Sequence, residues 1–84
     1  MSSGLQHLVQ MANDIGAYFA SEPDRAIALD GIATHVRRYW EPRMRRQIYA
    51  HLDAGGAGID ELPLAALRQL AAKERAEQER AATP

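Results

Sequence analysis

The chain has no cysteine, a single tryptophan, a single phenylalanine and no long apolar run. Without cysteine it can form neither a disulfide nor a thiolate metal site, which fits a reducing compartment. No apolar stretch approaches the roughly 18 residues that a membrane-spanning helix needs. The first residues also lack the basic and apolar regions of a signal peptide. We therefore expect a soluble, cytoplasmic protein that does not bind a membrane.

Signals for β-strands are also lacking, because β-branched residues are few and never alternate with polar ones. The apolar positions instead recur at spacings of three and four, which is typical of amphipathic helices. The pattern predicts helices over about residues 5–19, 24–39, 42–53 and 61 to the high seventies. We therefore expect an all-α protein, a small bundle of about four helices with a charged C-terminal tail that frays.

Local signals define the ends of these helices. Ser3 with Gln6 is a possible capping box, and Pro23 prevents the first helix from continuing. Pro42 suits the first position of the third helix, because its missing amide proton would have no partner there. The pair Gly55–Gly56 predicts a left-handed cap at the end of that helix. Asp60 is a suitable cap for the fourth helix.

With 84 residues, the chain is expected to be one domain whose core is marginal. The packed part should cover about residues 4–72, and the tail, about residues 73–84, should bury nothing of its own. Its helical form would depend on charge pairs such as Arg75 with Glu79. The predicted core consists of the apolar stripe positions, Leu8, Ile15, Phe19, Leu29, Ile32, Val36, Trp40, Met44, Ile48, Leu52, Leu67 and Leu70.

The net charge of −1 hides a strong asymmetry. Residues 37–46 carry five arginines and one glutamate, whereas residues 1–36 and 47–84 are both net acidic. We call residues 37–46 the arginine elbow. Because arginine binds carboxylates through two parallel hydrogen bonds, this segment favours an acidic partner surface. The predicted partner-binding residues are Arg37, Arg38, Tyr39, Arg43, Arg45, Arg46 and Tyr49.

The alternative for these arginines is a solvated helix face with local pairing, for example to Glu41. One or two of them should serve the chain's own helix ends. Trp40 could anchor a partner, but it continues the apolar stripe of Val36 and is better placed in the core.

No arrangement of residues predicts catalysis, cofactor binding or metal binding. The three histidines, His7, His35 and His51, do not have the spacing of metal ligands. His51 near a helix C-terminus is explained by the helix dipole. The glycines at 55, 56 and 58 follow a helix rather than a strand and lack a following Lys-Ser/Thr, so they do not form a phosphate loop.

Three blocks of the sequence resemble the delta subunit of soluble, NAD-dependent, molybdenum-containing formate dehydrogenases. They are LVQMANDIGAYF (8–19), HVRRYWEPRMRR (35–46), and HLDAGGAGI (51–59) leading into LPLAAL (62–67). The run RRYWEPRMR is the specific part.

The resemblance implies a small helical accessory subunit that binds a large catalytic subunit and supports its assembly, its stability or the insertion of its molybdenum cofactor. Other subunits would hold the molybdopterin cofactor, the iron–sulfur clusters, FMN and NAD. No catalytic residue is carried over from the family.

Two alternatives remain open at this point. The arginine elbow could bind nucleic acid, although the acidic flanks would repel phosphates. The chain could also be a chaperone that binds the catalytic subunit only during maturation. The sequence does not separate a transient factor from a permanent subunit.

Overall fold

The computed structural model describes residues 3–82, and within that range the chain forms four helices and no strand. The helices are α1 (Ser3–Phe19), α2 (Arg25–Tyr39), α3 (Pro42–Asp53) and α4 (Glu61–Ala82). The all-α prediction is confirmed, and each predicted helix is present. The predicted capping box depends on the Ser3 side chain, which lies outside the described part of the chain.

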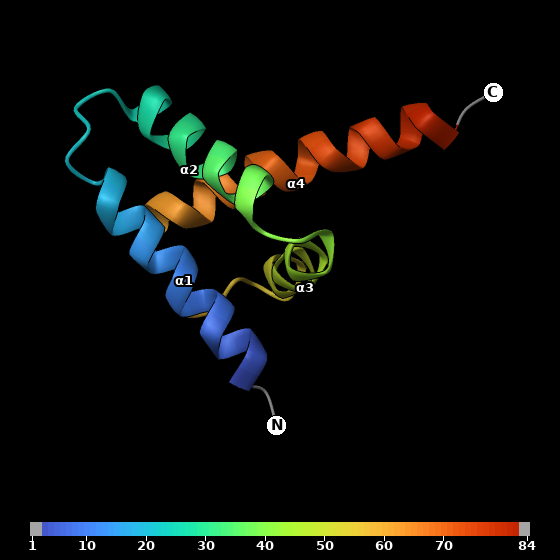
Figure 1. The fold of residues 1–84 in the computed structure, drawn as a ribbon, viewed down its shortest axis with the longest axis horizontal. Helices are drawn as coiled ribbons and strands as arrows, with labels where there is room; N and C mark the ends of the chain where they lie inside the picture. The colour runs from blue at the N-terminus through green and yellow to red at the C-terminus, as the bar shows by residue number, and fades with distance from the viewer. Residues whose placement is uncertain (1–2, 83–84) are drawn as a thin grey trace.

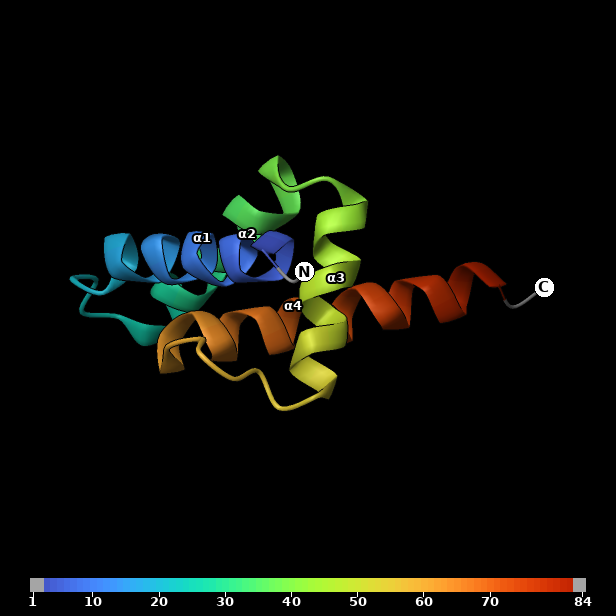
Figure 2. The same ribbon diagram turned by 90° about the horizontal axis from the view of Figure 1, so that it is seen from below.

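The four helices pack in two directions. In Figure 1, α1 and α2 lie side by side, α4 passes behind them and α3 is seen end-on. In Figure 2, α3 stands upright across α1 and α4. The most extensive packing is between α2 and α4, while α1 touches all three other helices. Beyond the crossing with α3, the C-terminal half of α4 projects away from the other helices (Figure 2).

Two helix ends show clear caps. The Asp24 carboxylate accepts hydrogen bonds from the amides of Ala26 (2.9 Å) and Ile27 (3.3 Å), so Asp24 is the N-cap of α2. Gly55 and Gly56 adopt φ angles of +115° and +68°. Their amides donate to the carbonyls of Leu52 (3.0 Å) and His51 (2.9 Å), the paired bonds of a Schellman cap. The prediction of a left-handed cap is confirmed.

The core collects residues from all four helices. Ile32, Val36, Ile48 and Leu67 are fully buried, and Trp40 is 3% exposed. Trp40 therefore belongs to the core, as predicted. All the predicted core residues are buried except Ile15, Phe19 and Met44, which are partly buried at its edge. The core also includes residues that were not predicted, namely Ala12, Ala28, Tyr49, Ile59, Ala66 and Ala71.

Two glycines allow close packing between elements. A Cβ atom on Gly31 would lie 2.4 Å from the Cε1 atom of Phe19, and one on Gly16 would lie 2.6 Å from the Cδ atom of Pro63. At Gly31 in α2, the close approach is made by the ring of Phe19 from α1.

Hydrogen bonds from side chains of α1 and α3 hold the connector between α3 and α4 in place. The Asn13 side chain donates to the carbonyl of Gly58 (2.9 Å) and accepts from the amide of Asp60 (2.8 Å). Nε2 of His51 lies 2.7 Å from the carbonyl oxygen of Ala57. These bonds, with the burial of Ile59, fix the start of α4 against α1.

Two isoleucines of α2 provide a matched test of this packing. Ile32 is fully buried, whereas Ile27 is 57% exposed. We predict that Ile32→Ala lowers the free energy of unfolding by about 2–5 kcal/mol, because it removes buried methyl groups and leaves a cavity. Ile27→Ala should change it by less than about 0.5 kcal/mol. Urea unfolding of both variants measures this difference, and equal midpoints would contradict the packing.

Candidate functional site

The arginine elbow joins α2 to α3 by a short, extended corner. Trp40 is the C-cap of α2, and its amide donates to the carbonyl of Val36 (2.9 Å). Glu41 has extended backbone angles, as is common before proline, and Pro42 begins α3. The carbonyl of Glu41 accepts the first helical bond of α3, from the amide of Arg45 (3.1 Å). The corner therefore turns the chain sharply and places arginines on both helices around it.

The inner side of the elbow closes on one carboxylate of α4, that of Glu74. The Nε atom of Arg45 lies 3.0 Å from Oε1 of Glu74, and the Tyr49 hydroxyl donates to the same oxygen. The Nε atom of Arg37 lies 3.6 Å from the other oxygen. The side chains of Arg45 and Glu74 are each only 14% exposed. We call these four residues the Glu74 cluster.

The cluster also satisfies backbone groups at the end of α2. The Nη1 atom of Arg45 donates to the carbonyl of Trp40 (2.6 Å) and, at 3.4 Å, to that of Arg37. A guanidinium with several donors can bridge a carboxylate and a helix end in this way. The expectation that one or two of the arginines serve the chain's own helix ends is met by Arg45.

The electrostatics of the cluster favour an ionised Glu74 and a protonated Tyr49. Burial acts to raise the pKa of Glu74, but hydrogen bonds from Tyr49 and Arg45, with the charges of Arg45 and Arg37, outweigh it and lower the pKa. Burial raises the pKa of Tyr49, and its bond to Glu74 raises it further. The Tyr49 hydroxyl is therefore a fixed donor at neutral pH.

The other elbow residues that were predicted to bind a partner, Arg38, Tyr39, Arg43 and Arg46, are all exposed, and Arg46 also lines a cavity with Arg45, Tyr49 and Glu74. Within the described range, no carboxylate pairs with Arg38, Arg43 or Arg46. Tyr39 is 67% exposed, and its ring lies 4.8 Å from that of His35. Arg38, Tyr39, Arg43 and Arg46, which we call the outer face of the elbow, are free to contact a partner.

The structure thus divides the seven predicted partner-binding residues. Arg45 and Tyr49 have internal roles in the Glu74 cluster, and Arg37 is bound on one side by Glu74 and by Glu77 (3.1 Å). The remaining four form the outer face. Contact of any of the seven with a partner stays a prediction.

Sequence reasoning missed the role of Glu74, because it placed this residue in a tail that buries nothing. The expectation is wrong at this position, where the carboxylate is held by two helices. A signal was present: Glu74 follows Leu67 and Leu70 at helical spacing, so it continues the buried stripe of α4. The next residue, Arg75, forms a two-point ion pair with Asp53 of α3 (2.9 and 3.2 Å).

Other kinds of site find little support in the described helices. Among residues 3–82, no three His, Cys, Asp or Glu side chains gather closely enough to hold a metal ion. None of the four helices combines the length and the apolar character that crossing a membrane demands.

Taken together, these features define a small helical domain in which several exposed arginines lie close together in sequence around the corner between α2 and α3. A family model, described as the NADH-dependent formate dehydrogenase delta subunit FdsD, matches residues 7–67. The chain therefore belongs to the formate dehydrogenase delta subunit family, as the resemblance indicated. The matched region includes the whole arginine elbow but ends before Glu74. The chain matches no curated protein and no solved structure significantly.

The hydrogen bond from Tyr49 to Glu74 gives a first test of the cluster. We predict that Tyr49→Phe lowers the free energy of unfolding by about 1.5–3 kcal/mol, because it removes a hydrogen bond to a charged acceptor and keeps the buried ring. Thermal or urea unfolding measures the change. Tyr39→Phe is the matched control, since the exposed hydroxyl should contribute nothing measurable, and equal losses in both variants would contradict this role.

The lowered pKa of Glu74 predicts a dependence of stability on pH. A carboxylate whose pKa is lower in the folded state contributes stability above its unfolded pKa, and that contribution is lost as the pH falls through the folded pKa. Wild-type protein should therefore lose stability on acidification below about pH 4. Glu74→Gln should be less stable than wild type at pH 7, and this difference should shrink in acid. If the difference in stability between wild type and Glu74→Gln stayed constant from pH 7 into acid, Glu74 would not be the titrating group.

Proposed function

We propose that this chain is a non-catalytic accessory subunit that binds the large catalytic subunit of a cytoplasmic, NAD-dependent molybdenum formate dehydrogenase. The family match over residues 7–67 carries the proposal. Membership of the delta subunit family implies that the chain works within a hetero-oligomeric complex. The identity of the partner subunit, the cytoplasmic setting and the lack of catalysis are the parts that we propose.

The redox groups of such a complex are assigned to its other subunits. These groups are the molybdopterin cofactor, the iron–sulfur clusters, FMN and NAD. The absence of cysteine supports the assignment for the clusters, because thiolates are their usual ligands. This chain would support assembly, stability or insertion of the molybdenum cofactor by holding the catalytic subunit in a competent form.

The outer face of the elbow is the proposed contact. Its three arginines are exposed and lack intramolecular carboxylates in the described part of the chain, so pairing them with an acidic patch breaks no existing ion pair. Arginine forks that meet carboxylates bidentately give both attraction and geometric specificity. Arg45 and Tyr49 would contribute indirectly, by fixing the corner that presents this face.

The arrangement gives less support to nucleic acid as the partner. Arg37 and Arg45 are engaged with Glu74, so the five arginines of the elbow do not form one continuous basic surface. Three exposed arginines at one corner, in a chain of net charge −1, suit a local acidic patch better than a phosphate backbone.

Co-expression with the formate dehydrogenase subunits of the same source tests the proposal. We expect a tagged chain to recover the large catalytic subunit in constant ratio. The triple variant Arg38→Glu, Arg43→Glu, Arg46→Glu should bind it at least tenfold more weakly, which corresponds to about 1.4 kcal/mol of binding free energy. High salt should weaken the complex of the wild-type chain more than the complex of the triple variant. Binding is measured by titration of purified components.

A matched control reverses three exposed basic residues of α4, Arg68→Glu, Lys73→Glu and Arg80→Glu, which changes the net charge equally. This control should bind nearly as wild type. If both triple variants bound the catalytic subunit equally weakly, the loss of binding would be due to net charge and not to the outer face. Failure of the wild-type chain to recover the catalytic subunit would overturn the proposed function. Recovery only from cells that are still maturing the enzyme would indicate a transient factor.

A further inference from the structure

A second surface, formed by α1 and α2, also lacks an intramolecular cover. A cavity of about 410 Å³ opens between these helices and is lined by Asp14, Ile15, Tyr18, Phe19 and His35. We call it the aromatic groove. The Tyr18 ring stands edge-on to that of Phe19, with centroids 5.1 Å apart. The His35 ring packs on Tyr39, which extends the groove toward the elbow.

The exposed apolar surface of the molecule is concentrated on these two helices. The large hydrophobic side chains that are exposed in the described range are Tyr18 (79%), Tyr39 (67%) and Ile27 (57%), all from α1 or α2. Met11, Ile15 and Tyr18 form one stripe of α1 by their spacing of four and three residues. Met11 and Ile15 are partly buried against the core, so Tyr18 is the exposed member of this stripe.

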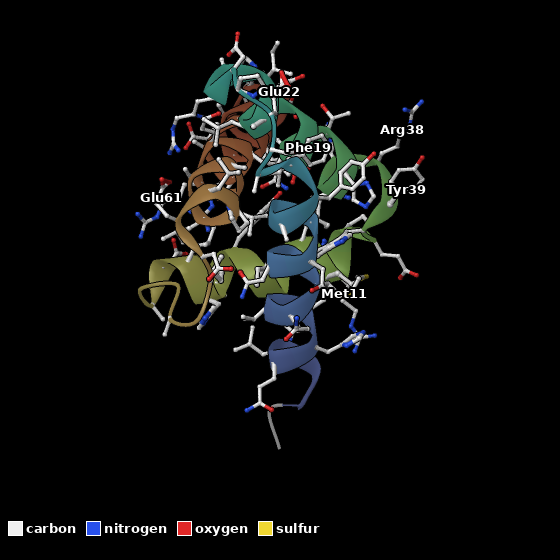
Figure 3. The ribbon with its side chains drawn as sticks, turned by 90° about the vertical axis from the view of Figure 1, so that its left-hand side faces the viewer. Met11, Phe19, Glu22, Arg38, Tyr39 and Glu61 are labelled. Atoms are coloured by element: carbon white, nitrogen blue, oxygen red, sulfur yellow. The ribbon has the colours of Figure 1, made fainter. Side chains whose placement is uncertain are left out.

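One positive charge lies at the edge of the groove. Figure 3 shows Arg38 and Tyr39 projecting together from the end of α2, on the same side of the molecule as Met11. Arg38 has no carboxylate partner in the described helices. The acid in the groove, Asp14, accepts a hydrogen bond from Gln10 (2.9 Å). A ligand that fills the groove would thus meet aromatic rings and the Asp14 carboxylate inside it, with the arginine toward the elbow.

We propose that the aromatic groove receives an apolar segment of the catalytic subunit, with a carboxylate beside its apolar residues that pairs with Arg38. The inference rests on the proposed function and extends it, because Tyr39 packs on His35 of the groove and also belongs to the outer face of the elbow. One partner would therefore cover both surfaces. The apolar residues supply most of the affinity, since tyrosine anchors dominate many interfaces.

The test compares two double variants in the assembled complex. Tyr18→Ala with Tyr39→Ala removes both exposed rings, whereas Tyr18→Phe with Tyr39→Phe keeps the rings and loses only the hydroxyls. We expect the alanine pair to bind the catalytic subunit at least tenfold more weakly and the phenylalanine pair to bind within threefold of wild type. Both isolated variants should melt as wild type does, because the two side chains are largely exposed.

The possible failures are distinguishable. If wild-type chain does not bind the catalytic subunit, the proposed function fails and the groove assignment fails with it. If wild type binds and the alanine pair binds equally well, only the groove assignment is overturned. Sedimentation of the isolated chain adds a further outcome: a dimer that the alanine pair abolishes, with catalytic-subunit binding unchanged, would assign the groove to a second copy instead.

Discussion

The carboxylate of Glu74 is the interaction on which the arrangement of the elbow depends. It accepts from Tyr49 and Arg45 of α3 and lies against Arg37 of α2, so one side chain of α4 joins three helices. Arg45 then reaches the carbonyl of Trp40 and closes the end of α2. Because hydrogen bonds to charged groups are stronger than neutral ones, this cluster defines the direction in which α3 leaves α2 more firmly than apolar contact alone.

That constraint matters because the core is small. Much of the apolar content is alanine, which brings the helices close but buries little area each. The fully buried large side chains, Ile32, Val36, Ile48 and Leu67, come from α2, α3 and α4. The C-terminal half of α4 projects beyond them, and the ion pairs of Glu74, Arg75 and Glu77 attach its first turns to the body.

Local signals were sufficient to predict the helices and most of the core. Pro23, Pro42 and the Gly55–Gly56 pair act within a few residues of the chain, so their effects are readable from sequence. The Glu74 cluster was not predictable in this way, because its members are separated by 25 residues or more from α4 to α3. From sequence alone, a carboxylate in line with buried apolar residues is expected to be solvated. That expectation changes only when the structure shows an arginine opposite it. Tyr49 was assigned to a partner surface for the same reason, since its acceptor could not be seen.

The placement of the arginines separates folding from binding. Adjacent residues on a helix point about 100° apart, so each neighbouring pair divides: Arg37 and Arg45 pair with Glu74, while Arg38 and Arg46 are exposed and pair with no carboxylate in the described range. A partner that pairs with the outward arginines would leave the inward ion pairs intact. The fold of this chain would then lose no stability on binding. Conversely, a change at an inward position would disturb the corner that presents the outward face. Loss of binding after such a change would therefore be evidence about the corner, and only changes at the outward positions would report on the proposed contact.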